Sequence, residues 1–151
     1  DWSSDVCSSD LKEKKIRAKE LPVGTAFHSP MMIPAADKLK TVLKEAGLKA
    51  PNAKIYANVT AEDMMKDFDG KDAGEYLADI MSRQAKSPVY WEETVHHFKR
   101  DGAEILIEIG PGKTLSGLAK KTEADLKRFN IENAESLKET IEGLKALKAE
   151  Q

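Results

Sequence analysis

The sequence has 151 residues, of which 40% are hydrophobic and 33% charged, and its formal net charge is −2. This composition is that of one ordinary soluble globular unit and does not indicate disorder. Because 24 Lys and Arg nearly balance 26 Asp and Glu, no excess of positive charge points to a nucleic-acid or anionic-membrane partner. The apolar runs are too short to cross a bilayer and no secretory leader is recognisable, so we expect a cytoplasmic protein. The single cysteine, Cys7, excludes an intrachain disulfide.

The first ten residues differ in character from the rest of the chain. Residues 1–10 repeat the triplet Ser-Ser-Asp and show no helical or strand periodicity. We interpret this tract as non-native, because it resembles translated sequencing-adapter sequence; a disordered native tail is the alternative. Under the first interpretation the reading frame was cut, and we expect residues that once preceded Lys12 to be missing.

The rest of the chain alternates strand-like and helix-like segments, which is typical of an α/β fold with mainly parallel strands. A short strand is expected to lead into Phe27. Apolar residues recur on one helical face over residues 32–46 and predict a helix that Gly47 ends. Residues 54–59 have the composition of a strand. The next helix is expected over residues 72–85.

The second half continues the same alternation. After the break at Ser87-Pro88, a helix is predicted from the apolar spacing of Trp91, Val95 and Phe98. Residues 103–109 are almost continuously apolar, which predicts a parallel strand covered on both faces. A glycine turn then leads into a helix over residues 114–121. A last amphipathic helix is expected to begin at a capping box, residues 136–139.

Histidine is the first candidate for chemistry. His28 lies just before a strongly amphipathic helix and at the expected end of a strand, where α/β folds place catalytic groups. A capping or packing role is the alternative for this residue. His96 and His97 are adjacent on one helix and cannot easily bind one metal ion, so we interpret them as solvent-facing. No metal site is predicted.

Three further polar features could serve a site. Gln84 shares the apolar face of its helix, so it is either a partly exposed helix-terminal residue or a side chain or carbonyl aimed into a site. Residues 110–113, Gly-Pro-Gly-Lys, suggest a phosphate loop but lack the P-loop spacing, which favours a tight structural turn. Glu108 is either a buried acid with a shifted pKa or, as we favour, an outward-facing strand residue. No serine lies in a Gly-x-Ser-x-Gly elbow, and Ser116 does not fit that pattern.

Four short motifs together resemble one family. They are Ala26-Phe27-His28-Ser29-Pro30 with the residues up to Ala35, Asn58-Val59-Thr60, Gln84-x-x-x-Pro88-Val89-x-Trp91, and Glu108-Ile109-Gly110-Pro111-Gly112-Lys113. Their order and spacing resemble the malonyl-CoA:acyl-carrier-protein transacylases from about Leu21 to Lys121. The resemblance implies that residues 11–151 are the C-terminal portion of the acyltransferase domain, an incomplete α/β-hydrolase-like parallel-sheet domain.

The resemblance also implies a function. In this family a serine in a Gly-His-Ser-Leu-Gly elbow accepts malonyl from malonyl-CoA and passes it to the phosphopantetheine thiol of acyl carrier protein, in fatty-acid biosynthesis. His28 matches the family's general base, and the Gln84 backbone carbonyl matches the group that orients it, with the Gln84 side chain secondary. Phe27 matches a position that favours malonyl over methylmalonyl. The implied partners are acyl carrier protein and the coenzyme A thioester, with no cofactor and a monomer when complete.

The chain departs from the family pattern in ways that limit the assignment. The serine elbow, the Gly-Gln-Gly-Ser oxyanion segment and the arginine that pairs with the malonyl carboxylate have no match here. We therefore expect an inactive fragment. Two alternatives remain, namely an acyltransferase domain cut from a polyketide or multidomain fatty-acid synthase, and a non-catalytic module that binds carrier protein.

Overall fold

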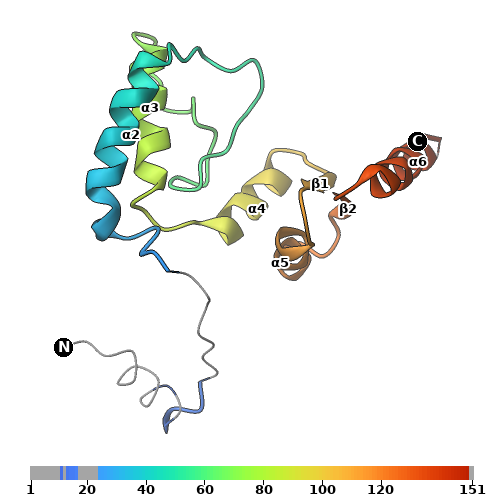
Figure 1. Ribbon diagram of the computed structural model, residues 1–151. Helices are drawn as coiled ribbons and strands as arrows, with labels where there is room; N and C mark the ends of the chain where they lie inside the picture. Colours follow the sequence, from blue (N-terminus) through green and yellow to red (C-terminus); the bar gives the residue numbers. More distant parts are fainter. Residues whose placement is uncertain (1–10, 12, 17–23, 150–151) are drawn as a thin grey trace.

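The computed structural model describes residues 11, 13–16 and 24–149 (Figure 1). In chain order its elements are the short 3₁₀-helix η1 (Pro30–Met32), α2 (Ile33–Glu45), α3 (Ala73–Gln84), α4 (Trp91–Arg100), β1 (Ile105–Ile109), α5 (Thr114–Thr122), β2 (Lys127–Ile131) and α6 (Ala134–Ala149). Figure 1 shows α2 and α3 side by side at one end of the molecule. The two strands lie with α5 and α6 at the other end, and α4 lies between the two groups.

The helices α2 and α3 pack side by side. Local sequence signals determine where each of them begins or ends. The Asp72 side chain accepts a hydrogen bond from the Glu75 amide at 2.9 Å and caps the start of α3. Gly47 follows α2 with φ +65°, a left-handed value that glycine adopts without strain. Only Ala36 of α2 is buried, while Val42 remains 60% exposed. The predicted helices are confirmed, but most of the apolar face of α2 is not covered within the described residues.

The strand predicted over residues 54–59 is wrong. This segment belongs to an irregular loop between α2 and α3, and its one strand-like contact is an isolated bridge from Tyr56 to Asp63. Ala57 and Met64 are buried against Leu77 and Ile80 of α3, so packing onto a helix replaces pairing within a sheet. The strand expected before Phe27 falls mostly on residues outside the described part, and residues 24–27 form no strand.

The helix α4 joins the loop to the sheet half of the molecule. On one side its Phe98 ring meets Tyr56 edge to face, with ring centres 4.7 Å apart. On the other side, the fully buried Val95 packs with Ala119 of α5 and with Leu126. Because its apolar residues serve both neighbours, α4 sets the position of the loop relative to the strands.

The sheet consists of β1 and β2, which pair in parallel from Ile105 with Lys127 to Ile109 with Ile131. The crossover between them is α5, so the predicted strand, turn and helix after residue 103 are confirmed as a βαβ unit. The strand β2 was not predicted. The expectation that β1 is covered on both faces is wrong for the described residues, since Ile109 is 79% exposed.

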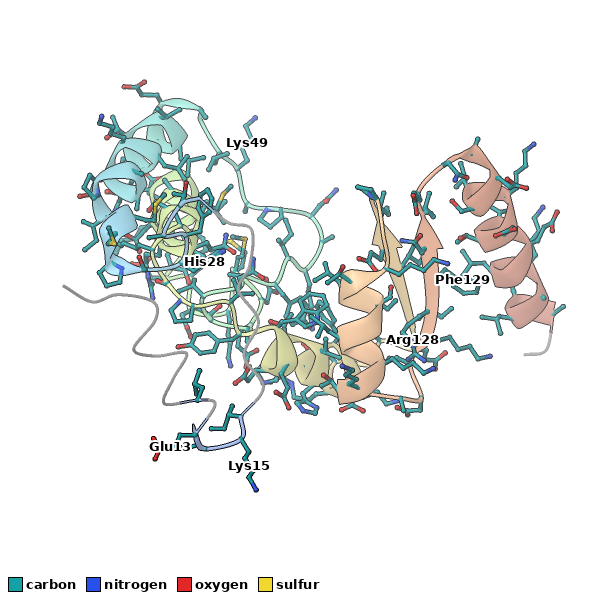
Figure 2. All side chains as sticks on the ribbon, turned by 60° about the horizontal axis from the view of Figure 1, so that its bottom comes forward. Glu13, Lys15, His28, Lys49, Arg128 and Phe129 are labelled. Atoms are coloured by element: carbon teal, nitrogen blue, oxygen red, sulfur yellow. The ribbon has the colours of Figure 1, made fainter. Side chains whose placement is uncertain are left out.

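The last helix begins earlier than the capping box predicted. Asn133, and not Ser136, is the cap: its side-chain oxygen accepts from the amides of Glu135 and Ser136, each at 3.0 Å. In return, the Ser136 hydroxyl oxygen accepts a hydrogen bond from the Asn133 amide at 3.0 Å. The helix packs on β2 at Gly143, where a built Cβ would lie 2.4 Å from the Phe129 ring. Figure 2 shows the Phe129 side chain of β2 beside α6.

Candidate active site

His28 lies on a short turn that is held in a strained conformation. Its φ is +60°, in the left-handed region that a non-glycine residue rarely adopts. The turn is fixed from both sides. The Ser29 hydroxyl donates to the Ala26 carbonyl at 2.7 Å, and the same oxygen accepts from the Met31 amide and caps η1. The His28 amide donates to the Ala85 carbonyl at 3.1 Å. Strain of this kind, of about 1–3 kcal/mol, persists where several contacts determine one conformation.

The His28 ring is oriented by two backbone carbonyls. Its Nδ1 atom lies 3.0 Å from the Gln84 carbonyl oxygen and 3.1 Å from the Ser87 carbonyl oxygen. A carbonyl oxygen can only accept, so Nδ1 must carry the hydrogen and donate it. In the neutral ring the Nε2 lone pair is then left free to accept a proton. Figure 2 shows His28 near the ends of α2 and α3.

The contact between the His28 ring and the Gln84 carbonyl is the one expected from the resemblance. Gln84 is the last residue of α3, where the carbonyls of a helix have no partner within the helix. His28 satisfies two of these terminal carbonyls, those of Gln84 and Ala85. The expected position of His28 at the C-terminal end of a strand is wrong, because a turn and η1 flank it. His28 therefore reaches the end of helix α3 from a turn and not from the end of a strand.

The Gln84 side chain has a partner of its own. Its Oε1 atom accepts a hydrogen bond from the Asn58 amide at 2.9 Å in a partly buried position. Gln84 is a partly exposed residue at the end of α3, as the first interpretation expected. It also makes two contacts: the carbonyl meets His28, and the side chain binds the neighbouring loop. Phe27 precedes His28 and is 57% exposed.

The two other histidines differ from each other. His96 is exposed and its Nδ1 atom lies 2.7 Å from a Glu123 carboxylate oxygen. His97 is partly buried, and its Nδ1 atom lies 2.7 Å from the Ala61 carbonyl oxygen. The prediction that both face solvent is thus wrong for His97, because the loop of residues 54–66 covers it.

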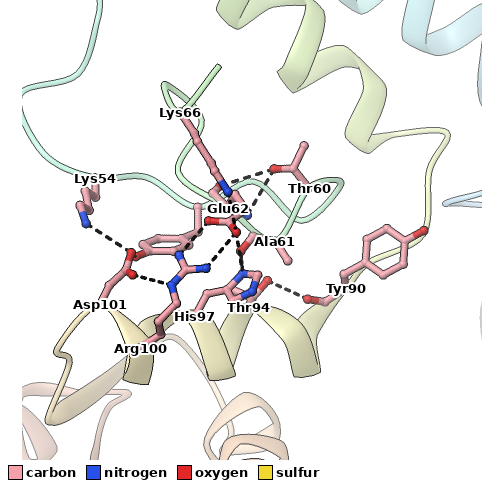
Figure 3. A network of polar contacts seen from close by, with 11 residues as sticks. Lys54, Thr60, Ala61, Glu62, Lys66, Tyr90, Thr94, His97, Arg100 and Asp101 are labelled. Carbon is pink, nitrogen blue, oxygen red and sulfur yellow. Dashed lines mark hydrogen bonds and ion pairs between the residues drawn. The ribbon is translucent and has the colours of Figure 1, made fainter. Parts of the chain in front are cut away.

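His97 belongs to a polar cluster that joins α4 to this loop, shown in Figure 3. Arg100 binds Glu62 through both guanidinium NH groups, at 3.0 and 2.9 Å. The hydrogen bonds from Arg100 and then Lys66 lower the pKa of Glu62 to about 2. Burial and then the hydrogen bond to Asp101 raise the pKa of Tyr56 to about 12. The cationic side chains of Arg100 and Lys66 remain about half exposed, at 49% and 53%, so solvent weakens the contribution of these ion pairs to stability.

The glycine turn after β1 does not form an anion site. Gly110 and Gly112 have φ values of +142° and +84°, as a tight turn requires. The Glu108 carboxylate accepts from the Leu115 amide at 3.1 Å and from the Ser116 amide at 2.8 Å. It thus occupies the position at the start of α5 where a phosphate would bind. Hydrogen bonds from Ser116 lower the pKa of Glu108. Because its carboxylate accepts from two amides at the start of α5, Glu108 is a helix cap.

Other kinds of site receive no support from the described part of the chain. It holds no group of three His, Cys, Asp or Glu side chains placed to bind a metal ion. Each of its helices falls short of the length and apolar character of a membrane span. Within the same residues, no hydrogen bond joins the His28 ring to a hydroxyl group.

The fold and site define an α/β protein with an exposed histidine whose Nδ1 atom is held by two backbone carbonyls. The chain matches the acyl transferase domain family over residues 5–149 and belongs to this family. It is 38% identical over 129 residues to the malonyl CoA-acyl carrier protein transacylase of Bacillus subtilis (strain 168), a match that covers 85% of this chain and 38% of that protein. The relatives found support the resemblance stated from the motifs.

Solved structures agree with this assignment. The malonyl CoA-acyl carrier protein transacylase of Clostridium perfringens superposes with a TM-score of 0.80 at 32% identity, over 93% of this chain and 42% of that one. A malonyl-transacylase in complex with its type II PKS acyl-carrier protein gives a TM-score of 0.78 at 31% identity, over 92% of this chain and 43% of that one. The chain therefore spans about two fifths of the length of the relatives it matches. The interpretation of residues 1–10 lies outside the described residues and stays a prediction.

Proposed function

We propose that this chain carries the general base of a malonyl-CoA:acyl-carrier-protein transacylase and that His28 is that base. The observation that carries the proposal is the pair of carbonyl acceptors on Nδ1, from Gln84 and Ser87. They favour the tautomer whose Nε2 atom can accept a proton. A base needs its proton-accepting atom exposed toward the nucleophile, and His28 is exposed.

The reaction follows from that tautomer. The Nε2 atom takes the hydroxyl proton of a serine as the serine oxygen attacks the thioester carbonyl of malonyl-CoA. The carbon–sulfur bond breaks, and the imidazolium returns the proton to the leaving coenzyme A sulfur. In the second half, Nε2 takes the proton of the phosphopantetheine thiol, whose sulfur displaces the serine oxygen and carries malonyl away. The serine oxygen recovers the proton from the ring.

The two carbonyls serve this cycle because Nδ1 keeps its hydrogen throughout. When the ring becomes positively charged, both carbonyl oxygens remain bonded to Nδ1–H, and a hydrogen bond from a charged donor is stronger than one from a neutral donor. The sequence contains no match to the family's serine elbow. The nucleophilic serine is therefore assigned to the remainder of an α/β-hydrolase-like domain. Gln84 and Ser87 act through their backbones.

The substrates and partners of the proposal come from the relatives. These are named for malonyl-CoA and acyl carrier protein, and one neighbour is a complex with its acyl-carrier protein. The names of the curated relatives, from Bacillus subtilis and Escherichia coli, favour this proposal over a polyketide or multidomain synthase fragment and over a non-catalytic module. The proposal includes a cytoplasmic enzyme of fatty-acid biosynthesis that needs no cofactor and is a monomer when complete.

The test is to supply the missing part of the domain. We would join this chain to the preceding part of the Bacillus subtilis relative and measure malonyl transfer to acyl carrier protein. His28→Ala should lower kcat/KM by about 10²- to 10⁴-fold, the usual contribution of a general base. His96→Ala is the matched control and should retain activity, because His96 contacts only a surface carboxylate. A His28→Ala chimera with parental activity would overturn the proposal.

The chain by itself gives a second test. Incubated with malonyl-CoA, it should form no stoichiometric covalent adduct detectable by mass spectrometry, because a base without its nucleophile cannot accept the acyl group. A malonyl-serine adduct with turnover would show that the chain contains a nucleophile and would contradict the proposed division of roles.

A further inference from the structure

Gln84 makes two hydrogen bonds in different directions at the end of α3. Its carbonyl accepts from His28 Nδ1 at 3.0 Å, and its side-chain Oε1 accepts from the Asn58 amide at 2.9 Å. The first bond needs only a backbone, which any residue would supply. The second needs this side chain, so the identity of the residue matters for the loop contact and not for the carbonyl itself.

The segment after Gln84 is the part of the molecule that determines the His28 conformation. Three contacts join His28 to residues 84–87: Nδ1 to the Gln84 carbonyl, the amide to the Ala85 carbonyl, and Nδ1 to the Ser87 carbonyl. The Gln84 carbonyl belongs to the last residue of α3 and the other two carbonyls follow it, at a helix end, where the backbone frays. Without a further restraint their directions would vary, and the His28 ring would follow them.

The loop that binds the Gln84 side chain is itself well anchored. The Asn58 carbonyl accepts from the Tyr90 amide at 3.0 Å, just before α4. Ala57 is fully buried, and its amide donates to the Glu62 carbonyl at 3.0 Å. Glu62 is bound in turn by Arg100 of α4 (Figure 3). Asn58 therefore offers Gln84 a donor whose place is set by both the core and α4.

We propose that the Gln84 side chain is a positioning residue for His28: by binding the Asn58 amide it fixes the end of α3 and thereby holds the His28 ring in the Nδ1–H tautomer. The tautomer is a property of this chain and is measured without activity. Its consequence for the reaction rests on the proposed function. The resemblance implies only a secondary part for the side chain, and its contact with the Asn58 amide gives it this separate role.

The main experiment observes the ring nitrogens directly. Long-range ¹H–¹⁵N correlation spectra of the ¹⁵N-labelled chain report which nitrogen carries the hydrogen, with His28 identified by its loss in His28→Gln. The parent chain should show the Nδ1–H form. Gln84→Leu should move His28 toward the Nε2–H form or a mixture of the two, because the carbonyls no longer hold one direction. Gln84→Glu should restore the parental form, since a carboxylate oxygen also accepts from the Asn58 amide.

Two controls separate positioning from general damage. Arg83→Leu changes the neighbouring exposed residue of α3, whose side chain is 3.8 Å from Asp79, and should leave the His28 spectrum unchanged. Hydrogen exchange of the parent chain tests the contact without any substitution: the Asn58 amide should be protected. A parental spectrum in Gln84→Leu would overturn the inference, and so would an unprotected Asn58 amide if Gln84→Leu failed to fold.

The chimera described above connects the tautomer to activity. There Gln84→Leu should lower kcat by about ten- to a hundredfold, the cost of a displaced catalytic group, with KM nearly unchanged, and Gln84→Glu should recover most of it. If His28→Ala abolishes transfer while Gln84→Leu does not slow it, the positioning inference fails and the proposed function stands. If His28→Ala transfers normally, the proposed function fails, while the tautomer spectra still decide the positioning role.

Discussion

Gly143 offers a sharp test of how α6 packs on the sheet. Alanine stabilises a helix interior by about 1 kcal/mol relative to glycine. At Gly143, however, a Cβ would lie 2.4 Å from Phe129 Cε1 and 2.9 Å from Cζ, both well inside van der Waals contact. The Phe129 ring would have to rotate away from α6, and overpacking of this kind costs about 1–3 kcal/mol.

Gly117 provides the matched control, because it lies in the interior of α5 and a Cβ built there meets nothing within 4 Å. Gly117→Ala should therefore stabilise the chain by about 1 kcal/mol. The propensity gain is common to both substitutions. The difference between the two variants then isolates the clash, and we expect Gly143→Ala to be less stable than Gly117→Ala by about 1–3 kcal/mol.

Urea unfolding followed by circular dichroism measures this difference, provided that the slopes of the transitions agree. Phe129→Leu in the Gly143→Ala background should recover part of the loss, because the shorter side chain leaves room for the methyl group. If Gly143→Ala stabilises the chain as much as Gly117→Ala does, then α6 does not lie against Phe129 as described and the reasoning is refuted.

Two further predictions concern the selectivity of the site and the cap of α5. In the chimera, Phe27→Ser should shift the ratio of the kcat/KM values for methylmalonyl-CoA and malonyl-CoA toward methylmalonyl-CoA by roughly tenfold or more, since one methyl group is worth about 1–3 kcal/mol of discrimination. An unchanged ratio with both rates reduced would assign Phe27 a packing role. Glu108→Ala should lower the free energy of unfolding at pH 7 by about 1 kcal/mol through loss of the cap. Because the pKa of Glu108 lies below its ordinary value of 4.5, the cap stabilises the fold above that pH and is lost as the pH falls through the lowered pKa. Unfolding at pH 7 and pH 3 should therefore show the difference between Glu108→Ala and the parent shrinking in acid, with the exposed Glu104→Ala as control; a difference independent of pH would contradict this role.

The helices could be predicted from the sequence because their signals are local. Apolar spacing, the Asp72 cap and the breaks at Gly47 and Gly102 all act within a few residues of the helix they define. The strand β1 was found for a similar reason, since its run of Ile105 to Ile109 is apolar apart from Glu108. Its partner β2 was missed, because Lys127–Ile131 mixes charged, aromatic and amide residues, and only pairing with β1 makes that segment a strand.

The candidate site divides in the same way. His28 and Gln84 could be singled out from the sequence, because one precedes an amphipathic helix and the other is a polar residue on an apolar helix face. The resemblance implied the contact between them. The residues alone could not imply it, since 56 positions separate the two and local periodicity carries no information over that distance. The sequence also misplaced His28 at a strand end, because a strand was expected to lead into Phe27, whereas residues 24–27 form no strand.

What the sequence by itself determined is the helices, the strand β1 and the residue types available for chemistry. The tertiary structure alone decided which groups meet: the two carbonyls on the His28 ring, the Asn58 amide on the Gln84 side chain, and the Glu108 carboxylate at the start of α5. The physical reason is that buried or terminal backbone groups must find partners. Which partner each one finds depends on how helices and loops pack, and packing is a property of the whole chain.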